Sequence, residues 1–284
     1  MKVTIIGAAN IDIIAKSKAV IIPGDSNPAD IKLKAGGVAR NIAAMLALHK
    51  IDVDLITAIG DDTFGNILRE SCEDIGINTD AWIVKSNINT GVYFASLERS
   101  GELYVGFNTT TAPESISKAE LTKHRNRIKN ADLLILDLNL SEKIINLAIE
   151  LRNGLPIMVD AVSAAKVPRI KNFLGMIDIL KLNRIEAEAL TGLTLDTKRQ
   201  VKQAACSLVC SGAKRVFITL GMAGVCAANA NAEIFVPAVP IDVKDVTGAG
   251  DAFAAGIAMN FTKDLRTQAE AGIALAAEHL GRKS

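Results

Sequence analysis

Short apolar segments rich in β-branched residues alternate with longer amphipathic segments along most of the chain. The apolar segments predict strands at 2–6, 53–59, 133–136, 157–160, 179–182 and 216–220. Helical periodicity predicts helices at 42–48, 63–75, 141–152 and 197–211, and the capping box Ser117-x-x-Glu120 opens another. Strands that alternate with helices form right-handed βαβ units. The pattern therefore predicts an α/β fold of three layers, with a mainly parallel central sheet and helices on both faces.

Two segments, 14–33 and 82–107, interrupt this alternation with a β pattern. We expect short strands at 20–22, 31–33 and 81–84, and longer ones at 90–98 and 103–107. Ser100-Gly101 between the last two predicts a hairpin turn. No repeat or low-complexity linker divides the sequence. We therefore expect a single domain over 1–284, with 14–33 and 82–107 inserted as a small β-lid.

Composition narrows the class of protein. The 284 residues are 49% hydrophobic and 22% charged, which is typical of a folded globular chain. The net charge of +1 argues against a nucleic-acid-binding protein, which would carry a basic field. The opening segment is too short and too soon polar for a signal peptide, and later apolar runs are too short to span a membrane. Four cysteines in a chain of this size form no disulfide framework, so a cytoplasmic protein is expected.

The stretch Thr247-Gly248-Ala249-Gly250-Asp251 reads as a glycine-bracketed turn that runs into a helix. Its backbone N–H groups and the positive end of the helix dipole together predict an anion site of phosphate size. Asp251 falls in the first helical turn beside that site, where it could accept a proton from an attacking hydroxyl. With the ordinary aspartate pKa of about 4, Asp251 would accept this proton late, as the bond between the hydroxyl oxygen and phosphorus forms. The alternative is that Asp251 only favours the helix start.

Polar residues after the first strand suggest a site for hydroxyl groups. Asn10 and Asp12 have strand spacing and point the same way, as a pair that recognises vicinal hydroxyls would. The glycine pair Gly36-Gly37 opens the next helix, and Asn41 lies in its first turns. Asn and Asp are also common in ordinary turns, and a lone glycine pair is weak evidence.

Later strands also end in polar or glycine-rich segments. Asn139 follows the strand at 133–136, and Ser163 and Lys166 follow the strand at 157–160. A last glycine-rich turn after 216–220 contains Thr219, Gly221 and Gly224. Each could be a cap or a surface loop. Together they favour a phosphoryl-transfer site at the carboxyl edge of the sheet, where ligands bind in open parallel sheets.

Asn183 and Glu186 follow the strand at 179–182 and lie three residues apart on one helical face. Such a pair could hold a hydrated Mg²⁺, which prefers oxygen ligands and keeps several waters. The same pair could also be a simple helix cap.

These motifs, in this order, resemble those of the ribokinase-like (PfkB-type) carbohydrate and nucleoside kinases over the whole chain. The motifs are Gly36-Gly37 with Asn41, Asn183-x-x-Glu186, Thr219-Leu220-Gly221 and the stretch 247–251. Within the family, segments 7–13, 25–28, 36–42 and 159–166 are similar to the subgroup that acts on pseudouridine. Ribokinases usually carry a lysine after the glycine pair, where this chain has Val38.

The resemblance implies ATP with Mg²⁺ as phosphoryl donor and a β-lid that covers the sugar and often forms a homodimer contact. It implies Asp251 as base, with Gly248, Ala249 and Gly250 around the transferred phosphoryl group. Acceptor contacts would come from Asn10, Asp12, Gly36, Gly37, Asn41, Thr90, Asn139, Ser163 and Lys166. Asn183 and Glu186 would act through Mg²⁺ and its waters, and Thr219, Gly221, Gly224 and Thr247 would line the nucleotide. Many relatives also bind a monovalent cation such as K⁺, here at Asp245 and Thr247.

The implied reaction is transfer of the γ-phosphoryl group of ATP to the 5′-hydroxyl of a ribosyl compound, with pseudouridine as the first candidate. A ribokinase or another nucleoside kinase is the alternative within the family. A non-catalytic nucleoside or nucleotide sensor on the same fold is the alternative of another class, although a sensor would be free to lose Asp251 and the glycines. Family members normally continue beyond the helix that ends here near Leu280, so the chain is either naturally short or truncated.

Overall fold

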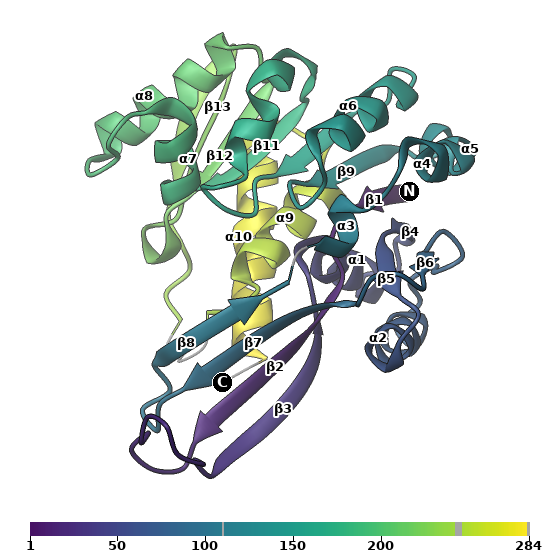
Figure 1. Cartoon of the computed structure of the whole chain (residues 1–284). Coiled ribbons are helices and arrows are strands. Elements are labelled where there is room, and N and C mark those ends of the chain that lie inside the picture. The colour runs from purple at the N-terminus through teal and green to yellow at the C-terminus, as the bar shows by residue number, and fades with distance from the viewer. Residues whose placement is uncertain (110, 242–245, 283–284) are drawn as a thin grey trace.

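An eight-stranded sheet forms the centre of the protein, for which the computed structural model describes residues 1–109, 111–241 and 246–282. Its order is β14-β13-β12-β11-β10-β9-β1-β4, parallel from β4 to β12 and antiparallel beyond (Figure 1). The strands are β1 (Lys2–Ile6), β4 (Asp52–Ile56), β9 (Leu133–Asp137), β10 (Ile157–Asp160), β11 (Ile179–Asn183), β12 (Arg215–Thr219), β13 (Val225–Asn229) and β14 (Ala232–Val236).

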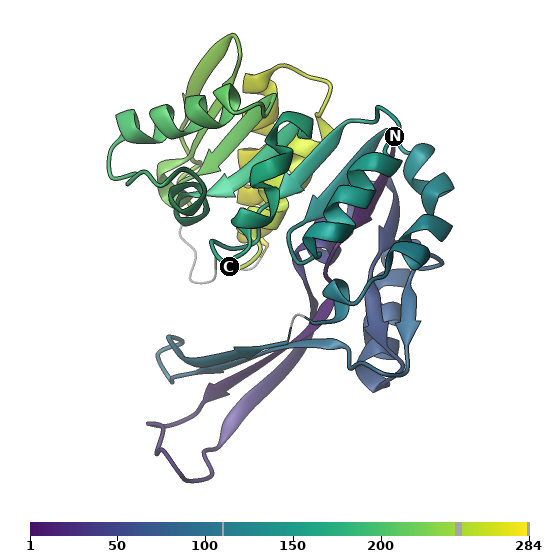
Figure 2. The same cartoon turned by 45° about the horizontal axis from the view of Figure 1, so that its top comes forward.

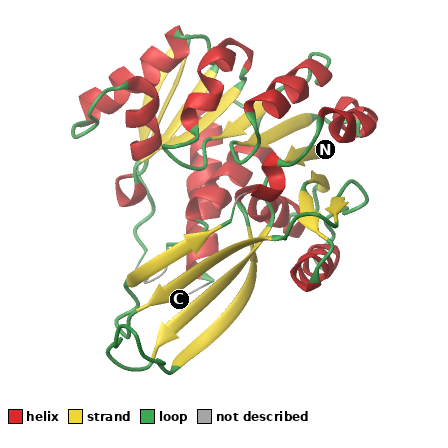
Figure 3. Cartoon of the chain, in the orientation of Figure 1, coloured by secondary structure: helices red, strands yellow, loops and turns green. Residues whose placement is uncertain are grey.

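Helices cover both faces of this sheet, because alternate side chains of its buried strands are apolar on both sides. One face packs against α4 (Lys118–Lys123), α5 (Arg125–Lys129), α6 (Glu142–Leu151), the 3₁₀ helix η1 (Val167–Met176), α7 (Arg184–Thr191) and α8 (Lys198–Cys210). The other packs against α1 (Val38–Leu48), α2 (Thr63–Glu73), α9 (Ala249–Met259) and α10 (Leu265–Gly281). The predicted three-layer α/β fold is confirmed (Figure 3).

The chain changes direction within the sheet beside β1. From β1 it continues to β4 on one side, whereas β9 pairs with the other side of β1. Such a switch point leaves a crevice at the carboxyl ends of the two strands, which is where ligands bind in doubly wound folds. The segments that follow β1 and β9 therefore meet at the expected place for a site.

A separate four-stranded sheet of order β3-β2-β7-β8 extends away from the layered part (Figure 2). Its strands are β2 (Asn10–Ser17), β3 (Ala29–Gly36), β7 (Gly91–Leu97) and β8 (Leu103–Asn108), and β7 and β8 form the predicted hairpin. Strand β3 contains the strand expected at 31–33. The short α3 (Thr111–Glu114) follows β8.

Two strand predictions in these segments are wrong. Residues 20–22 form a loop, where Val20 is exposed and the side chain of Asn27 binds both backbone groups of Ile22. The strand near 81–84 is β6 (Ile83–Lys85), but it pairs with β5 (Ala58–Gly60) outside the four-stranded sheet. Trp82 and Ile83 are buried there, so burial draws this segment away from the four-stranded sheet.

One face of the four-stranded sheet carries a row of large apolar side chains. Leu33, Ile13, Phe94 and Phe107 are cross-strand partners over β3, β2, β7 and β8. Leu33 is 51% exposed and Phe107 64% exposed, which is unusual for large apolar residues at neighbouring ladder positions. By strand alternation this row lies on the face opposite to Asn10 and Asp12.

Among the described residues, no helix is long and apolar enough to cross a membrane.

Candidate active site

The amino end of α9 forms the centre of the site. Gly248 precedes the helix with a φ of 79°, which glycine adopts without strain, and no side chain among the described residues caps the helix. The N–H of Ala249 donates a 3.2 Å hydrogen bond to the carbonyl of Val246. The N–H groups of Gly250 and Asp251, like the first N–H groups of any helix, lack a partner within the helix and can bind an anion. Asp251 lies in this turn, and its Oδ2 accepts a hydrogen bond of 2.8 Å from Nδ2 of Asn41 on α1.

Burial raises the pKa of Asp251 to about 7, and the neighbouring Asp160 carboxylate adds to the rise. The Lys181 ammonium and the hydrogen bond from Asn41 act in the opposite direction. Asp251 thus differs from the ordinary aspartate expected from the sequence. A carboxylate that titrates near neutrality is well matched to general-base work.

A polar row lies at the carboxyl end of the sheet, on the face covered by α1 and α9. Asp137, Asp160 and Lys181 are cross-strand partners on β9, β10 and β11, and all are at most 5% exposed. Burial disfavours a charged lysine, but the carboxylates of Asp160, Glu186 and Asp251 outweigh it and raise the pKa of Lys181. A Cβ on Gly250 would lie 3.1 Å from Lys181 Nζ, so the ammonium lies against the first turn of α9.

Lys181 was missed by the sequence interpretation, although a signal was available. It is a charged residue inside the otherwise apolar strand Ile179-Leu180-Lys181-Leu182. A lysine is seldom buried without a charged partner.

The acceptor pocket, as we name it, has a volume of about 480 Å³ and opens where β1 and β9 end. One wall comes from the four-stranded sheet, where Asn10 Nδ2 donates a 2.6 Å hydrogen bond to Asp12 Oδ1. The two side chains share a face, as predicted. Asp12 packs over Gly36, where an added Cβ would lie 2.4 Å from the carboxylate oxygens. The pocket is lined by Ala8, Ala9, Asn10, Asp12, Gly37, Val38, Asn41, Gly91, Tyr93, Asn108, Thr109, Pro113, Asn139, Val162, Ser163, Ala165 and Lys166.

The opposite wall of the acceptor pocket includes Asn139, Ser163 and Lys166. Lys166 Nζ donates a hydrogen bond to Asn139 Oδ1, and burial lowers the pKa of Lys166. Below them, the buried Asp137 accepts hydrogen bonds from the N–H groups of Ala8 and Asn139. Burial nevertheless raises the pKa of Asp137 above its usual range.

Thr90 does not line the acceptor pocket. Its hydroxyl donates a 2.7 Å hydrogen bond to Asp62 Oδ1 and accepts one of 3.0 Å from the N–H of Gly60, and the residue is only 1% exposed. Thr90 therefore fixes the loop before β7, whereas its neighbour Gly91 reaches the pocket.

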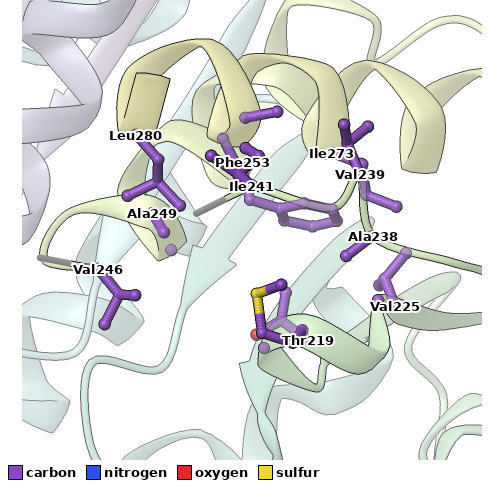
Figure 4. A pocket seen from close by; sticks show the side chains of 16 residues that line it. Thr219, Val225, Ala238, Val239, Ile241, Val246, Ala249, Phe253, Ile273 and Leu280 are labelled. Carbon is purple, nitrogen blue, oxygen red and sulfur yellow. The ribbon is translucent and has the colours of Figure 1, made fainter. Parts of the chain in front are cut away.

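The donor pocket, as we name the second cavity, lies against the first turn of α9 and has a volume of about 260 Å³. Thr219, Gly221 and Gly224, expected to line a nucleotide, lie at one side, and Ala249 and Gly250 lie at another. Phe253, Ile273 and Leu280 close it from α9 and α10 (Figure 4). The 3₁₀ helix η2 (Gly221–Ala223) follows β12 at this edge.

Asn183 and Glu186 form a capping box at the start of α7. Asn183 Oδ1 accepts a 2.9 Å hydrogen bond from the N–H of Glu186, and Glu186 Oε2 accepts one of 2.7 Å from the N–H of Asn183. Burial raises the pKa of Glu186, which is 2% exposed. The described residues contain no group of three His, Cys, Asp or Glu placed to hold a metal ion. The amide and carboxylate oxygens fit a hydrated Mg²⁺ that takes its remaining ligands from water and phosphate.

The expected cation site is only partly described. Asp245 lies outside the described residues. The carbonyl oxygen of Thr247 lies 3.2 Å from Nε2 of His279 on α10, which brings this helix to the α9 turn.

Comparison with known proteins gives one consistent result. The pfkB carbohydrate kinase family matches residues 1–284. The chain is 34% identical to pseudouridine kinase of Escherichia coli over 285 residues, covering 98% of this chain and 91% of that protein. It is 28% identical to ribokinase of Staphylococcus aureus over 278 residues, covering 95% and 89%.

The solved structures agree with these relatives. A carbohydrate kinase from Agrobacterium tumefaciens superimposes with a TM-score of 0.85 at 31% identity, covering 97% of this chain and 89% of that one. Arabidopsis thaliana ribokinase, solved with ribose and ATP, superimposes with a TM-score of 0.88 at 25% identity, covering 99% and 93%. The chain therefore belongs to the pfkB family of carbohydrate kinases.

Proposed function

We propose that the protein transfers the γ-phosphoryl group of ATP to the 5′-hydroxyl of a ribosyl compound, and that its substrate is pseudouridine. The observation that carries the proposal is the position of Asp251. Its helix turn lines the mostly apolar donor pocket through Ala249 and Gly250, and one hydrogen bond connects Asp251 to the acceptor pocket, which is rich in polar groups. The hydrogen bond from Asn41, which lines the acceptor pocket, directs the Asp251 carboxylate toward that side.

In the proposed reaction, Asn10, Asp12 and Asn41 bind the hydroxyls of the sugar and hold its 5′-oxygen near Asp251. The bond from that oxygen to phosphorus forms as the bond from phosphorus to the ADP oxygen breaks. The proton of the hydroxyl passes to Asp251. With a pKa near 7, this carboxylate is a stronger base than an ordinary aspartate and is still ionised in about half of the molecules at pH 7.

The donor side would stabilise charge on the transferred group. The N–H groups of Gly248 and Gly250 would bind its oxygens, as helix amino ends bind phosphate. Ala249, whose N–H donates to the carbonyl of Val246, would hold the turn between them. Mg²⁺, when bound, would neutralise phosphate charge. The Asn183–Glu186 box would orient the water ligands of that ion. Binding of K⁺ near Asp245 and Thr247 stays a prediction.

Recognition of pseudouridine over uridine needs a contact to the base, since the two share ribose and ring shape. Pseudouridine presents an N1–H donor where uridine has only C–H. The candidates to accept from this N–H are the hydroxyls of Thr90 and Ser163 and a carbonyl of the lid. Of the two side chains, Ser163 lines the acceptor pocket and Thr90 does not. We therefore propose Ser163 as the acceptor. Leaving a buried acceptor unpaired costs about 1–3 kcal/mol, or roughly ten- to a hundredfold in kcat/KM.

An ATP-coupled assay with pseudouridine, uridine, adenosine, ribose and fructose 6-phosphate tests this proposal. We expect the highest kcat/KM for pseudouridine, and N1-methylpseudouridine, which lacks the donor, should be as poor as uridine or worse. Equal turnover of pseudouridine and N1-methylpseudouridine would show that the base edge is not read. Preference for ribose would favour the ribokinase alternative, which the similarity to ribokinases keeps open. No turnover of any acceptor, with binding retained, would favour a sensor.

We also propose that the four-stranded sheet acts as a lid on the acceptor and that its apolar face joins two copies in a homodimer. Asn10, Asp12, Tyr93 and Asn108 on one face of the sheet line the acceptor pocket. The opposite face carries the exposed row of Leu33, Ile13, Phe94 and Phe107. A second copy would remove this row from water.

A further inference from the structure

Asp160 occupies the middle of the polar row at the end of the sheet. It pairs in register with Asp137 on β9 and with Lys181 on β11, and it is 1% exposed. It lines neither the acceptor nor the donor pocket. A buried carboxylate at this position therefore needs a role other than direct contact with a ligand.

One oxygen of Asp160 holds a strained turn. Asp160 Oδ1 accepts a 2.9 Å hydrogen bond from the N–H of Val162, which has a φ of 64°. The N–H of Ser163 donates a 2.6 Å hydrogen bond to the carbonyl of Ala161, which closes a γ-turn around Val162. A positive φ is an outlier for a β-branched residue and persists only where its surroundings enforce it. Val162 and Ser163 both line the acceptor pocket.

The other oxygen of Asp160 holds a buried cation. Lys181 Nζ lies 3.0 Å from Asp160 Oδ2, and Lys181 is 5% exposed. The same ammonium lies against Gly250, where the absence of a Cβ leaves it room. Gly250 lines the donor pocket and precedes Asp251 in the first turn of α9. The charge of Lys181 is thus added to the positive end of the helix.

We propose that Asp160 is a positioning residue that supports both halves of the site through its two oxygens. Through Oδ1 it fixes the Val162 turn and hence Ser163 at the acceptor. Through Oδ2 it fixes the Lys181 ammonium beneath the turn that binds the phosphoryl group. The inference rests on the proposed phosphoryl transfer. The two contacts predict separate effects: loss of the turn should change acceptor binding, and loss of the ammonium should change the rate of transfer.

The test compares two double variants, because removing one partner of a buried ion pair strands the other charge and can unfold the protein. Asp160→Asn/Lys181→Met removes both charges but keeps an oxygen that can accept from Val162. Asp160→Ala/Lys181→Met removes both charges and that oxygen. Each is compared with the wild type for kcat and acceptor KM, using whichever acceptor the assay identifies.

We expect kcat to fall about tenfold or more in both double variants, since each loses the ammonium beside the transferred charge. Acceptor KM should stay within about threefold of wild type in the Asn variant and rise about tenfold in the Ala variant. Adding Val162→Gly to the Ala variant should lower KM again, because glycine adopts a positive φ without strain. A merely structural role would not separate KM from kcat in this way.

A second readout needs no ligand and no activity. Amide hydrogen exchange by NMR at Val162 and Ser163 should be faster in the Ala variant than in the Asn variant. A wild-type protein that phosphorylates no acceptor would refute the proposed function, while this comparison would still decide whether Asp160 holds the turn. Equal amide exchange in the two variants would contradict the proposal that Asp160 Oδ1 fixes the Val162 turn. A kcat equal to that of the wild type in Asp160→Asn/Lys181→Met would contradict the proposal that the Lys181 ammonium assists the transfer.

Discussion

Asp251 has the chemical environment that a base for an alcohol requires. An aspartate with a pKa near 4 would have to wait until bond formation acidifies the hydroxyl. Burial moves the pKa of Asp251 to about 7, which makes the carboxylate a stronger base and leaves it ionised in about half of the molecules at pH 7. The opposing effects of Asp160 and Lys181 on this pKa show that the polar row also tunes it.

The pKa of Asp251 predicts a pH dependence. Because only the ionised carboxylate accepts a proton, kcat/KM should fall about tenfold per pH unit below pH 7 and level off above it. Phosphate groups also titrate near pH 6, so the variant Asn41→Ala is needed to assign the pH dependence to Asp251. Losing the hydrogen bond from Asn41 removes an interaction that lowers the pKa of Asp251, so the midpoint should move to higher pH. A flat profile between pH 5 and 8 would contradict a base with this pKa.

Single residues differ in how well their roles could be read from the sequence. Asn10 and Asp12 share a face because strand alternation dictates it, and this was predictable. Thr90 was misjudged because its partner, Asp62, lies 28 residues away and takes up its hydroxyl. The pairing of Asp160 with Lys181 depends on β10 and β11 being neighbours, which no local pattern specifies.

At the scale of elements, the four-stranded sheet links the acceptor pocket to solvent. Its strands β2 and β7 each contribute two residues to the lining of the acceptor pocket, while most of β8 is exposed. Such a sheet can become less mobile when a ligand fills the pocket, because few buried contacts hold its far end.

Nucleoside binding should therefore protect the β7–β8 hairpin. We expect amide hydrogen exchange in Gly91–Leu97 and Leu103–Asn108 to slow when the acceptor is added, since a closed lid excludes water from the reaction. The hairpin of β13 and β14, at the far edge of the main sheet, serves as the internal control and should not change. Unchanged exchange in β7 and β8, with binding confirmed by calorimetry, would contradict closure.

Helix starts that carry a capping box could be predicted from the sequence, whereas α1 begins at Val38, four residues before the predicted start. The capping box at Ser117 forms as expected, and Thr197 caps α8 in the same way. The exposed apolar run at 20–22 was taken for a strand because local pattern does not reveal whether a partner strand exists. There the side chain of Asn27 satisfies the backbone of Ile22 instead.

For the whole molecule, the exposed row of Leu33, Ile13, Phe94 and Phe107 predicts a homodimer. Replacing both exposed residues, Leu33→Ser/Phe107→Ser, should convert a dimer to a monomer, as measured by analytical ultracentrifugation at micromolar concentration. Val84→Ser is the matched control, because Val84 is also an exposed apolar strand residue but lies on β6 outside this sheet. A monomeric wild type, or a double variant that remains dimeric, would contradict this interface.

The layered fold could be predicted because strands and helices alternate along the chain, and alternation leaves few arrangements. The order of the strands could not be predicted, because it depends on the side of β1 to which each later strand is added. That order brings Asn41, Asp160 and Asp251 together from positions up to 210 residues apart.

Asp251→Asn tests most directly whether Asp251 is the base of a phosphoryl-transfer reaction. The variant keeps an oxygen that can accept from Asn41. Because folding raises the pKa of Asp251, its charge opposes folding above pH 7, so the variant should melt no lower than wild type at pH 8. We expect acceptor binding within a few-fold of wild type by calorimetry and a kcat reduced about 10²–10⁴-fold. A folded variant that retains more than about a tenth of the wild-type kcat would contradict the assignment of Asp251 as the base.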